Sequence, residues 1–337
     1  MRFSFEPLTL KTRHVFAISR GASDTFGGAV VRLEHWGLEG VGEAAPSPYY
    51  GETQATVMAA LDALKSEIPD DPFLVEELHE RMEKRMRGNP SAKAAIDIAV
   101  HDLIGKKLGV PLHAFFGLSA GRAPRTSFTI GIDDVRVMMQ KVGEAAEYPV
   151  LKVKVGTDRD EQVMDALRSV TDKTLRVDAN CAWTPREAVK KIAMLEKFNV
   201  EFVEQPIPPG DIPGMKFVRD NVALPIIVDE SVETSVDIEP LAGAVDGINI
   251  KLMKCGGLRE AVKMVHVARA LGMKVMLGCM VESSVGITAA AHISPAVDYA
   301  DLDGNLLLAR DPFEGVAVRQ GQIVLPSEPG LGVRSRS

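Results

Sequence analysis

The feature that most constrains the fold is a series of eight short apolar, β-rich runs between residues 127 and 303. The runs cover 127–132, 151–155, 175–179, 201–204, 225–229, 248–252, 275–280 and 299–303. They recur about every 25 residues, which is the length of one strand joined to one helix. The segments 185–198 and 258–271 between them carry apolar residues at helical spacing. This alternation predicts an α/β protein built on a parallel (β/α) barrel.

The two ends of the chain differ from this pattern. After the last run, the segment 305–313 is too short for a full helix, so we expect a modified TIM barrel with a (β/α)7β order. Before the first run, 29–35 and 37–42 predict a hairpin, followed by helices around 52–64, 72–86 and 91–108. The tail 316–325 has two strand-like runs around Gln320 and Gly321 and is expected to pack on the N-terminal unit. We therefore predict an α+β capping domain at 1–120, completed by the tail 312–337, and a catalytic barrel at 121–311.

Composition excludes several classes of function. The chain has 39 Lys and Arg against 46 Asp and Glu, and this net charge of −7 argues against a nucleic-acid partner. The same negative charge argues against an anionic membrane as partner. No run of about 18 uncharged apolar residues is present, so no membrane span is expected. The chain has an odd number of cysteines, namely Cys181, Cys255 and Cys279. Their spacing is typical neither of a disulfide framework nor of a thiolate metal site. Since the N-terminus also lacks a signal-peptide core, we expect a soluble protein of the reducing cytoplasm.

Charged residues cluster where the predicted strands end. Buried parallel strands are nearly all apolar, so charges within them are costly and need a reason. Here the exceptions lie at the ends of six predicted strands. They are Lys152 and Lys154 on the second strand, Asp178 on the third, Glu204 on the fourth, Asp229 on the fifth, Lys251 on the sixth, and Asp301 with Asp303 on the eighth. The carboxyl ends of barrel strands form the active-site face. Their shared position favours one functional site over scattered surface charges.

Three of these acids, Asp178, Glu204 and Asp229, lie on adjacent strands. Three converging carboxylates repel one another unless a cation neutralises them. Oxygen ligands without His or Cys favour a hard divalent ion, so we expect one Mg²⁺, or Mn²⁺, per subunit. The alternative is a structural network in which these acids pair with the neighbouring lysines.

The lysines suggest acid/base chemistry. Lys152 and Lys154 face the same side of one strand, and neighbouring ammonium groups with a dication would lower a lysine pKa toward the range of a general base. Lys251 is four strands away and should face Lys154 across the barrel mouth. Two bases on opposite sides of one carbon are what a 1,1-proton transfer with inversion requires. Asp301 and Asp303 could then hold a cationic group of the substrate, although Asp-Leu-Asp-Gly is equally a turn signal.

These motifs together resemble the enolase superfamily, within its muconate lactonizing enzyme subgroup. The stretches that carry the resemblance are LKVKVG, RVDAN, VEQP, VDES, INIKLMKCGG, GCMVES and ADLDG, with further similarity in GEAAPSPYYGE and SAKAAIDIAVHDLIGKKLG. The Asp-x-Asp pair on the eighth strand is similar to that of the dipeptide epimerases of this subgroup. The resemblance implies a Mg²⁺-dependent isomerase that inverts the α-carbon of the C-terminal residue of a dipeptide, of the L-Ala-D/L-Glu type, through a metal-stabilised enolate. A homo-oligomer is also expected.

The resemblance also implies a role for each matching residue. Lys154 and Lys251 become the acid/base catalysts, and Asp178, Glu204 and Asp229 the metal ligands. Lys152, Asp301, Asp303, Thr129, Cys279 and Val281 become substrate-binding residues, and Arg20 in the capping loop meets an acidic substrate side chain. Tyr49 and Tyr50 stand where some relatives carry basic residues, which leaves the side-chain preference open.

Other functions remain compatible with the sequence. A cycloisomerase or an o-succinylbenzoate synthase of the same subgroup would use the same barrel, but their substrates lack the ammonium group that Asp301 and Asp303 would bind. A non-catalytic barrel that serves as a scaffold needs none of the lysines. A Schiff-base lysine enzyme would be trapped by borohydride, whereas a metal enzyme would be inactivated by EDTA.

Overall fold

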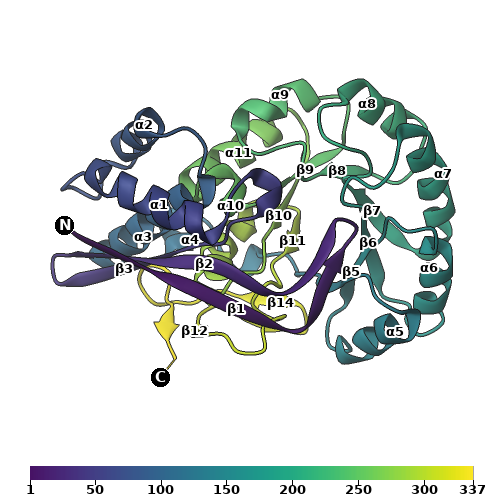
Figure 1. Ribbon diagram of the computed structural model, residues 1–337, viewed down its shortest axis with the longest axis horizontal. Helices are drawn as coiled ribbons and strands as arrows, with labels where there is room; N and C mark the ends of the chain where they lie inside the picture. Colours follow the sequence, from purple (N-terminus) through teal and green to yellow (C-terminus); the bar gives the residue numbers. More distant parts are fainter. Residues whose placement is uncertain (337) are drawn as a thin grey trace.

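The barrel is formed by eight parallel strands in one sheet. The computed structural model describes residues 1–336, and Figure 1 shows the strands ringed by helices, with the N-terminal part of the chain across their mouth. The strands are β4 (Phe128–Ile130), β5 (Val150–Lys154), β6 (Thr174–Asp178), β7 (Val200–Glu204), β8 (Ile226–Val228), β9 (Gly247–Ile250), β10 (Lys274–Gly278) and β11 (Tyr299–Asp301). They follow one another in chain order, and a parallel bridge between Thr126 and Ala300 joins the first and last ends. All eight predicted strands are confirmed.

Helices occupy each of the seven connections between these strands. They are α5 (Val135–Glu144), α6 (Asp160–Arg168), α7 (Pro185–Leu195), α8 (Ile212–Asp220), α9 (Ile238–Leu241), α10 (Leu252–Cys255), α11 (Leu258–Ala270) and α12 (Ser284–Ile293). In α7 the Thr184 side chain accepts from the Glu187 amide, and Pro185 opens the first turn, as the sequence suggests. Within residues 1–336 no helix follows β11, which agrees with the predicted (β/α)7β order.

The capping unit packs a three-stranded antiparallel sheet on helices. It contains β1 (Arg2–Ile18), β2 (Gly21–His35), β3 (Leu38–Ala44), α1 (Gln54–Leu64), α2 (Val75–Arg85), α3 (Pro90–Leu108) and α4 (Leu112–Phe115). The hairpin of β2 and β3 and the three predicted helices are confirmed, whereas the strand β1 was not predicted from the sequence. The sheet lies so close to α3 that a side chain at Gly42 would overlap the Ala95 carbonyl oxygen. The cap has its own core, which includes Val31, Leu61 and Ile96.

Short elements complete the chain. The 3₁₀ turns are Pro48–Tyr50, Lys65–Glu67, Ala120–Arg122, Glu196–Phe198, Ser235–Asp237 and Ser294–Ala296, and the tail strands are β12 (Phe313–Glu314), β13 (Ala317–Arg319), β14 (Gln322–Val324) and β15 (Arg334–Ser335). The predicted tail hairpin, β13 with β14, is present. It lies against the start of the barrel, where the Thr126 amide donates to Gly321 O at 2.9 Å.

A later part of the tail does reach the capping unit. The Leu331 amide donates to Asp102 on α3 at 2.7 Å. The boundaries at 120 and 312 remain a prediction. Among the helices of residues 1–336, none has the length and apolar character needed to cross a bilayer.

Candidate active site

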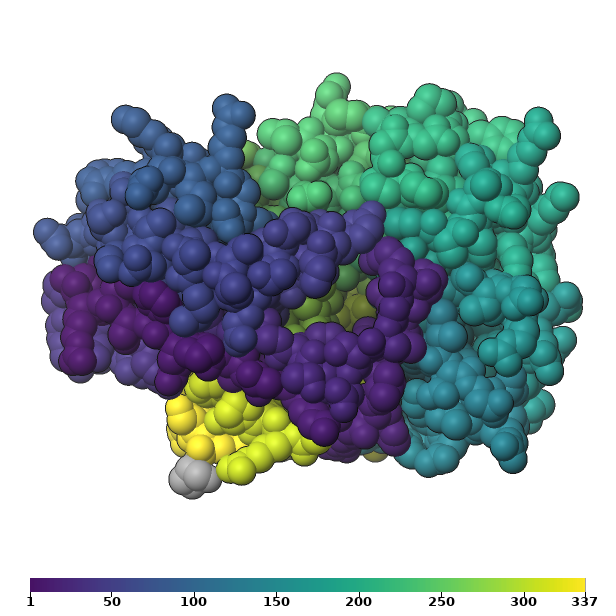
Figure 2. Space-filling model, in the orientation of Figure 1, coloured from purple at the N-terminus to yellow at the C-terminus, as the bar shows by residue number. Residues whose placement is uncertain are grey.

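A cavity of about 370 Å³ lies between the carboxyl ends of the barrel strands and the cap. Figure 2 shows its opening between the purple β1–β2 hairpin and the blue-violet segment that follows β3. The predicted site residues that line it are Arg20, Thr129, Lys152, Lys154, Asp229, Lys251, Cys279, Val281, Asp301 and Asp303. The remaining two, Asp178 and Glu204, are fully buried at the ends of β6 and β7. The structure therefore brings all the predicted site residues to one end of the barrel.

The strand register explains how the charges meet. Lys154 pairs in register with Asp178, and Asp178 in turn with Glu204, so the three side chains stand in a row at the barrel mouth. Lys251 follows β9, which is four strands from β5 in the sheet order. The two lysines predicted as acid/base catalysts therefore lie on opposite sides of the mouth.

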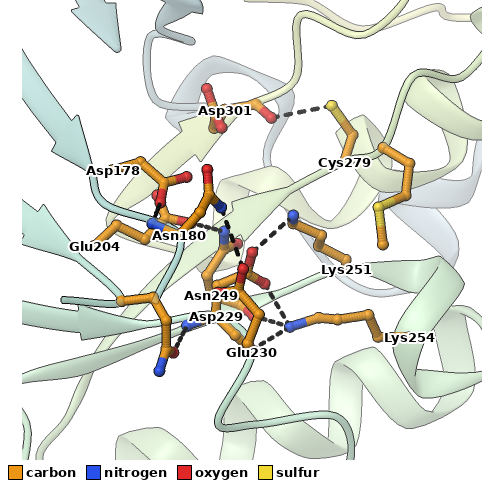
Figure 3. Close-up of polar contacts among 12 residues, drawn as sticks. Asp178, Asn180, Glu204, Asp229, Glu230, Asn249, Lys251, Lys254, Cys279 and Asp301 are labelled. Atoms are coloured by element: carbon orange, nitrogen blue, oxygen red, sulfur yellow. Dashed lines mark hydrogen bonds and ion pairs between the residues drawn. The ribbon is translucent and has the colours of Figure 1, made fainter. Parts of the chain in front are cut away.

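Each of these two lysines is paired with an aspartate. Lys154 Nζ lies 2.6 Å from Asp178 Oδ2, and Lys251 Nζ lies 2.8 Å from Asp229 Oδ2. Figure 3 shows Lys251 directed at Asp229 from the side opposite to Asp178. The arrangement is two similar ion pairs that flank one cavity.

Lys152 lies between three carboxylates. Its Nζ is 2.7 Å from Asp301 Oδ2, 2.8 Å from Glu204 Oε2 and 3.1 Å from Asp178 Oδ2. Although burial opposes the charge, these acids raise the pKa of Lys152 well above its ordinary value. The expectation that a lysine of this pair has a lowered pKa is therefore wrong for Lys152. The reason is that neighbouring carboxylates, rather than ammonium groups, dominate its surroundings.

The pKa values of the carboxylates at the site are shifted in different directions by their surroundings. Burial and the adjacent Asp178 raise the pKa of Glu204 to about 7. For Asp178 burial acts in the same sense, but Lys154 and Lys152 outweigh it and lower the pKa to about 2. The site thus holds buried acids whose ionisation depends on nearby positive charge.

The same acids are suited to a divalent cation. No three Asp, Glu, His or Cys side chains of residues 1–336 are arranged around a common metal position, because lysine amines lie between the acids. The donor chemistry nevertheless fits Mg²⁺, which prefers carboxylate oxygens. Glu204 is fully buried, and its Oε2 lies 2.8 Å from the Lys152 ammonium, so this oxygen already faces the kind of positive charge that a bound cation would also supply. Asp178, Glu204 and Asp229 are the residues that would hold it.

The acidic pair of the eighth strand is also ordered by hydrogen bonds. Asp301 accepts from Ser127 Oγ at 2.5 Å, and Asp303 accepts from the Thr129 amide at 2.6 Å. Burial and Asp301 raise the pKa of Asp303 to about 7, so a cationic group beside it would favour its ionised form. Cys279 adjoins the pair by donating to Asp301 O at 3.3 Å. The turn interpretation and the binding interpretation are compatible, because the turn holds both carboxylates in the cavity wall.

Two residues at the site were missed from the sequence. Lys254 is fully buried and donates to Asp229 Oδ1 at 2.6 Å and to the Asp229 and Val232 carbonyls. Glu230 is buried and pairs with Arg20 at 2.6 Å. A signal for Lys254 exists, since it follows Lys251 by three residues, about one helical turn. Glu230 has no comparable signal beyond its place next to Asp229.

Comparison with known proteins agrees with this architecture. Residues 6–117 match the mandelate racemase/muconate lactonizing enzyme N-terminal domain, and residues 134–336 match the family described as enolase C-terminal domain-like. The chain belongs to the enolase superfamily. The family expected from the motifs is thereby confirmed, and with it an enzyme of the isomerase class.

Several relatives within the superfamily are epimerases. The chain is 45% identical to an L-Ala-D/L-Glu epimerase of Bacteroides thetaiotaomicron, over 99% of this chain and 88% of the relative. It is 41% identical to an L-Ala-D/L-amino acid epimerase of a Maribacter species, over 99% of each. A dipeptide epimerase of Enterococcus faecalis, solved with Mg and L-Leu-L-Tyr, superposes with a TM-score of 0.93 at 38% identity over 99% of each chain.

Proposed function

We propose that this enzyme is a dipeptide epimerase that inverts the α-carbon of the C-terminal residue by a two-lysine proton transfer. The observation that carries the proposal is the pair of lysines on opposite sides of one cavity, Lys154 with Asp178 and Lys251 with Asp229. A single base could remove and return a proton only on one face. Two bases that face each other can invert the centre between them.

The remaining charged residues bind the two charged ends of the substrate. Lys152 is placed to attract the substrate carboxylate, and Asp301 and Asp303 to bind the N-terminal ammonium group at the other end of the dipeptide. Thr129, Cys279 and Val281 line the space near this acidic pair.

Proton movement is assigned to the two lysines alone. In one direction Lys154 Nζ accepts the α-proton and Lys251 Nζ donates a proton to the opposite face, and in the other direction the roles are exchanged. We assign one Mg²⁺ per subunit, or Mn²⁺, to Asp178, Glu204 and Asp229. When bound, this ion would supply positive charge against the negative charge that develops on the substrate carboxylate.

The relatives support this choice of substrate, because they are epimerases named for dipeptides or for L-Ala derivatives. We further propose that the protein acts as a homo-oligomer in the cytoplasm. The three cysteines are free thiols in the structure, which suits a reducing compartment.

The test is proton exchange in deuterated solvent. The protein is incubated with a set of L,L-dipeptides and Mg²⁺ in D₂O, and products are analysed by mass spectrometry and chiral chromatography. We expect deuterium at the α-carbon of the C-terminal residue together with inversion, and loss of both after EDTA treatment until Mg²⁺ is restored. Absence of exchange across the whole set would refute the proposed function.

A further inference from the structure

The capping hairpin contributes one charged side chain to the cavity. Arg20, between β1 and β2, places Nη1 2.6 Å from Glu230 Oε1 and 3.0 Å from the Asn180 carbonyl oxygen. Its guanidinium carbon lies 4.1 Å from the centre of the Tyr49 ring. The Arg20 side chain is 30% exposed, whereas that of Glu230 is fully buried. Arg20 is therefore the cation that compensates a buried carboxylate.

Glu230 depends on this pairing. Its only other hydrogen bond comes from Asn180 Nδ2 at 3.2 Å, and its Oε2 has no hydrogen-bond partner within residues 1–336. A buried carboxylate that loses its counterion is strongly destabilised. An acidic substrate side chain would have to share Arg20 with Glu230, and two carboxylates on one guanidinium repel each other in a poorly solvated place.

Within residues 1–336, the other cations of the cavity wall are three lysines, which the proposed function assigns to proton transfer and to the substrate carboxylate rather than to the substrate side chain. The four that line the cavity are each paired with a carboxylate: Arg20 with Glu230, Lys152 with Asp301, Lys154 with Asp178, and Lys251 with Asp229. Apart from Arg20 and Ser23, the hairpin side of the cavity is apolar, with Phe16, Ile18 and Phe26 in its wall.

We propose that Glu230 is a specificity-determining residue that neutralises Arg20 and directs the enzyme to dipeptides with an uncharged, preferably apolar, C-terminal side chain. This inference rests on the proposed epimerase function and makes it narrower. It replaces the expectation that Arg20 receives an acidic side chain. Glu230 acts through Arg20 and is a positioning residue rather than a catalytic one.

The experiment compares two substrates on the same enzyme sample. We measure kcat/KM for L-Ala-L-Leu and L-Ala-L-Glu with Mg²⁺, for the wild type and for Glu230→Gln. The wild type is expected to favour L-Ala-L-Leu by roughly tenfold or more. In Glu230→Gln the guanidinium is released, so the ratio should move toward L-Ala-L-Glu by roughly tenfold, mainly through a lower KM for that substrate. A ratio of two substrates is independent of the fraction of active enzyme.

The matched control is Glu233→Gln, which removes one negative charge from the same loop at an exposed position outside the cavity wall. Its substrate ratio should stay that of the wild type. A wild-type preference for L-Ala-L-Glu, or a ratio unchanged in folded Glu230→Gln, would overturn the inference and leave the epimerase function intact. Failure of the wild type on both dipeptides and on the wider set would instead overturn the proposed function.

A second variant covers the case in which Glu230→Gln does not fold. Arg20→Met combined with Glu230→Gln removes both charges of the pair and leaves no buried ion uncompensated. If Arg20 is fully engaged with Glu230, the ratio between the two dipeptides stays within about threefold of the wild type. A selective loss of L-Ala-L-Glu turnover would mean that Arg20 serves the acidic side chain, contrary to the inference.

Discussion

The floor and the lid of the cavity are built on different principles. The floor carries its lysines and carboxylates at or next to the ends of parallel strands, where backbone pairing sets which charge faces which. The lid is the β1–β2 hairpin, whose Arg20 is held by Asn180 and Glu230 in loops of the barrel and by the Tyr49 ring of the cap. In the functions proposed above, reaction chemistry belongs to the floor and side-chain selection to the lid. Changes to the floor should alter catalysis, and changes to the lid should alter preference.

The largest effect is expected from the floor lysines. Lys251→Met should reduce epimerisation by about 10³- to 10⁴-fold, because one of the two proton-transferring groups is missing. The variant should still exchange the α-proton of the epimer that faces Lys154, and Lys154→Met should show the opposite preference. Exchange in D₂O measured separately for each epimer checks this. Equal exchange of both epimers by either single variant would contradict a two-base mechanism.

The second-largest effect is expected at Asp301 and Asp303, the acidic pair at the end of β11. Asp303→Asn should reduce kcat/KM for dipeptides by about 100-fold, because the substrate ammonium loses a buried partner. The change should fall mainly on KM. Asp158→Asn, at an exposed position after β5, is the control and should leave the kinetics unchanged. Full activity of Asp303→Asn would favour a cycloisomerase-type substrate that has no ammonium group.

The smallest effect is expected on stability, at the contact between the cap and the barrel, where Glu43 of β3 lies near Glu282 after β10. Glu43 accepts from the Ser283 amide at 2.8 Å and from the Gly286 amide at 2.9 Å. Burial raises the pKa of Glu43 to about 7 and that of Glu282 to about 8. Both acids keep their protons in the folded protein at pH values where the unfolded chain has lost them.

The sign of the pH dependence follows from this difference. The contribution of these two acids to the free energy of unfolding is fully present below their unfolded-state pKa of about 4.5. It is lost as pH rises through their pKa values in the folded protein. We expect the free energy of unfolding to drop by about 3 kcal/mol or more between pH 5 and pH 8. Glu282→Gln should reduce this slope, as measured by urea unfolding at fixed ionic strength. Glu239→Gln, which changes an exposed acid on α9, should retain the wild-type slope.

Much of the floor could be predicted from the sequence, because its signals are local. Apolar runs at regular spacing predict the strands, and charges such as Asp178 and Lys251 at their ends are conspicuous against a buried background. β1 was missed because it is an edge strand with one exposed side, interrupted by charges and by Pro7. Proline is tolerated at an edge, so the sequence there lacks the usual strand signature.

The lid and the ionisation of the site could not be predicted in the same way. Arg20 and Glu230 are 210 residues apart, and their contact depends on how the cap docks on the barrel. The pKa of Lys152 depends on three acids from three different strands, whose distances follow only from the folded barrel. Spacing along the chain identified the participants but not which charge compensates which.

The paired arrangement of Lys154 with Asp178 and Lys251 with Asp229 has a consequence for reversibility. An enzyme that interconverts two epimers has to run at comparable rates in both directions, since neither epimer is much more stable than the other. With an aspartate beside each lysine, the forward and reverse reactions meet nearly the same electrostatic surroundings. The equilibrium between the epimers is fixed by their own free energies and not by the enzyme, so the direction of net conversion depends on which epimer is consumed elsewhere.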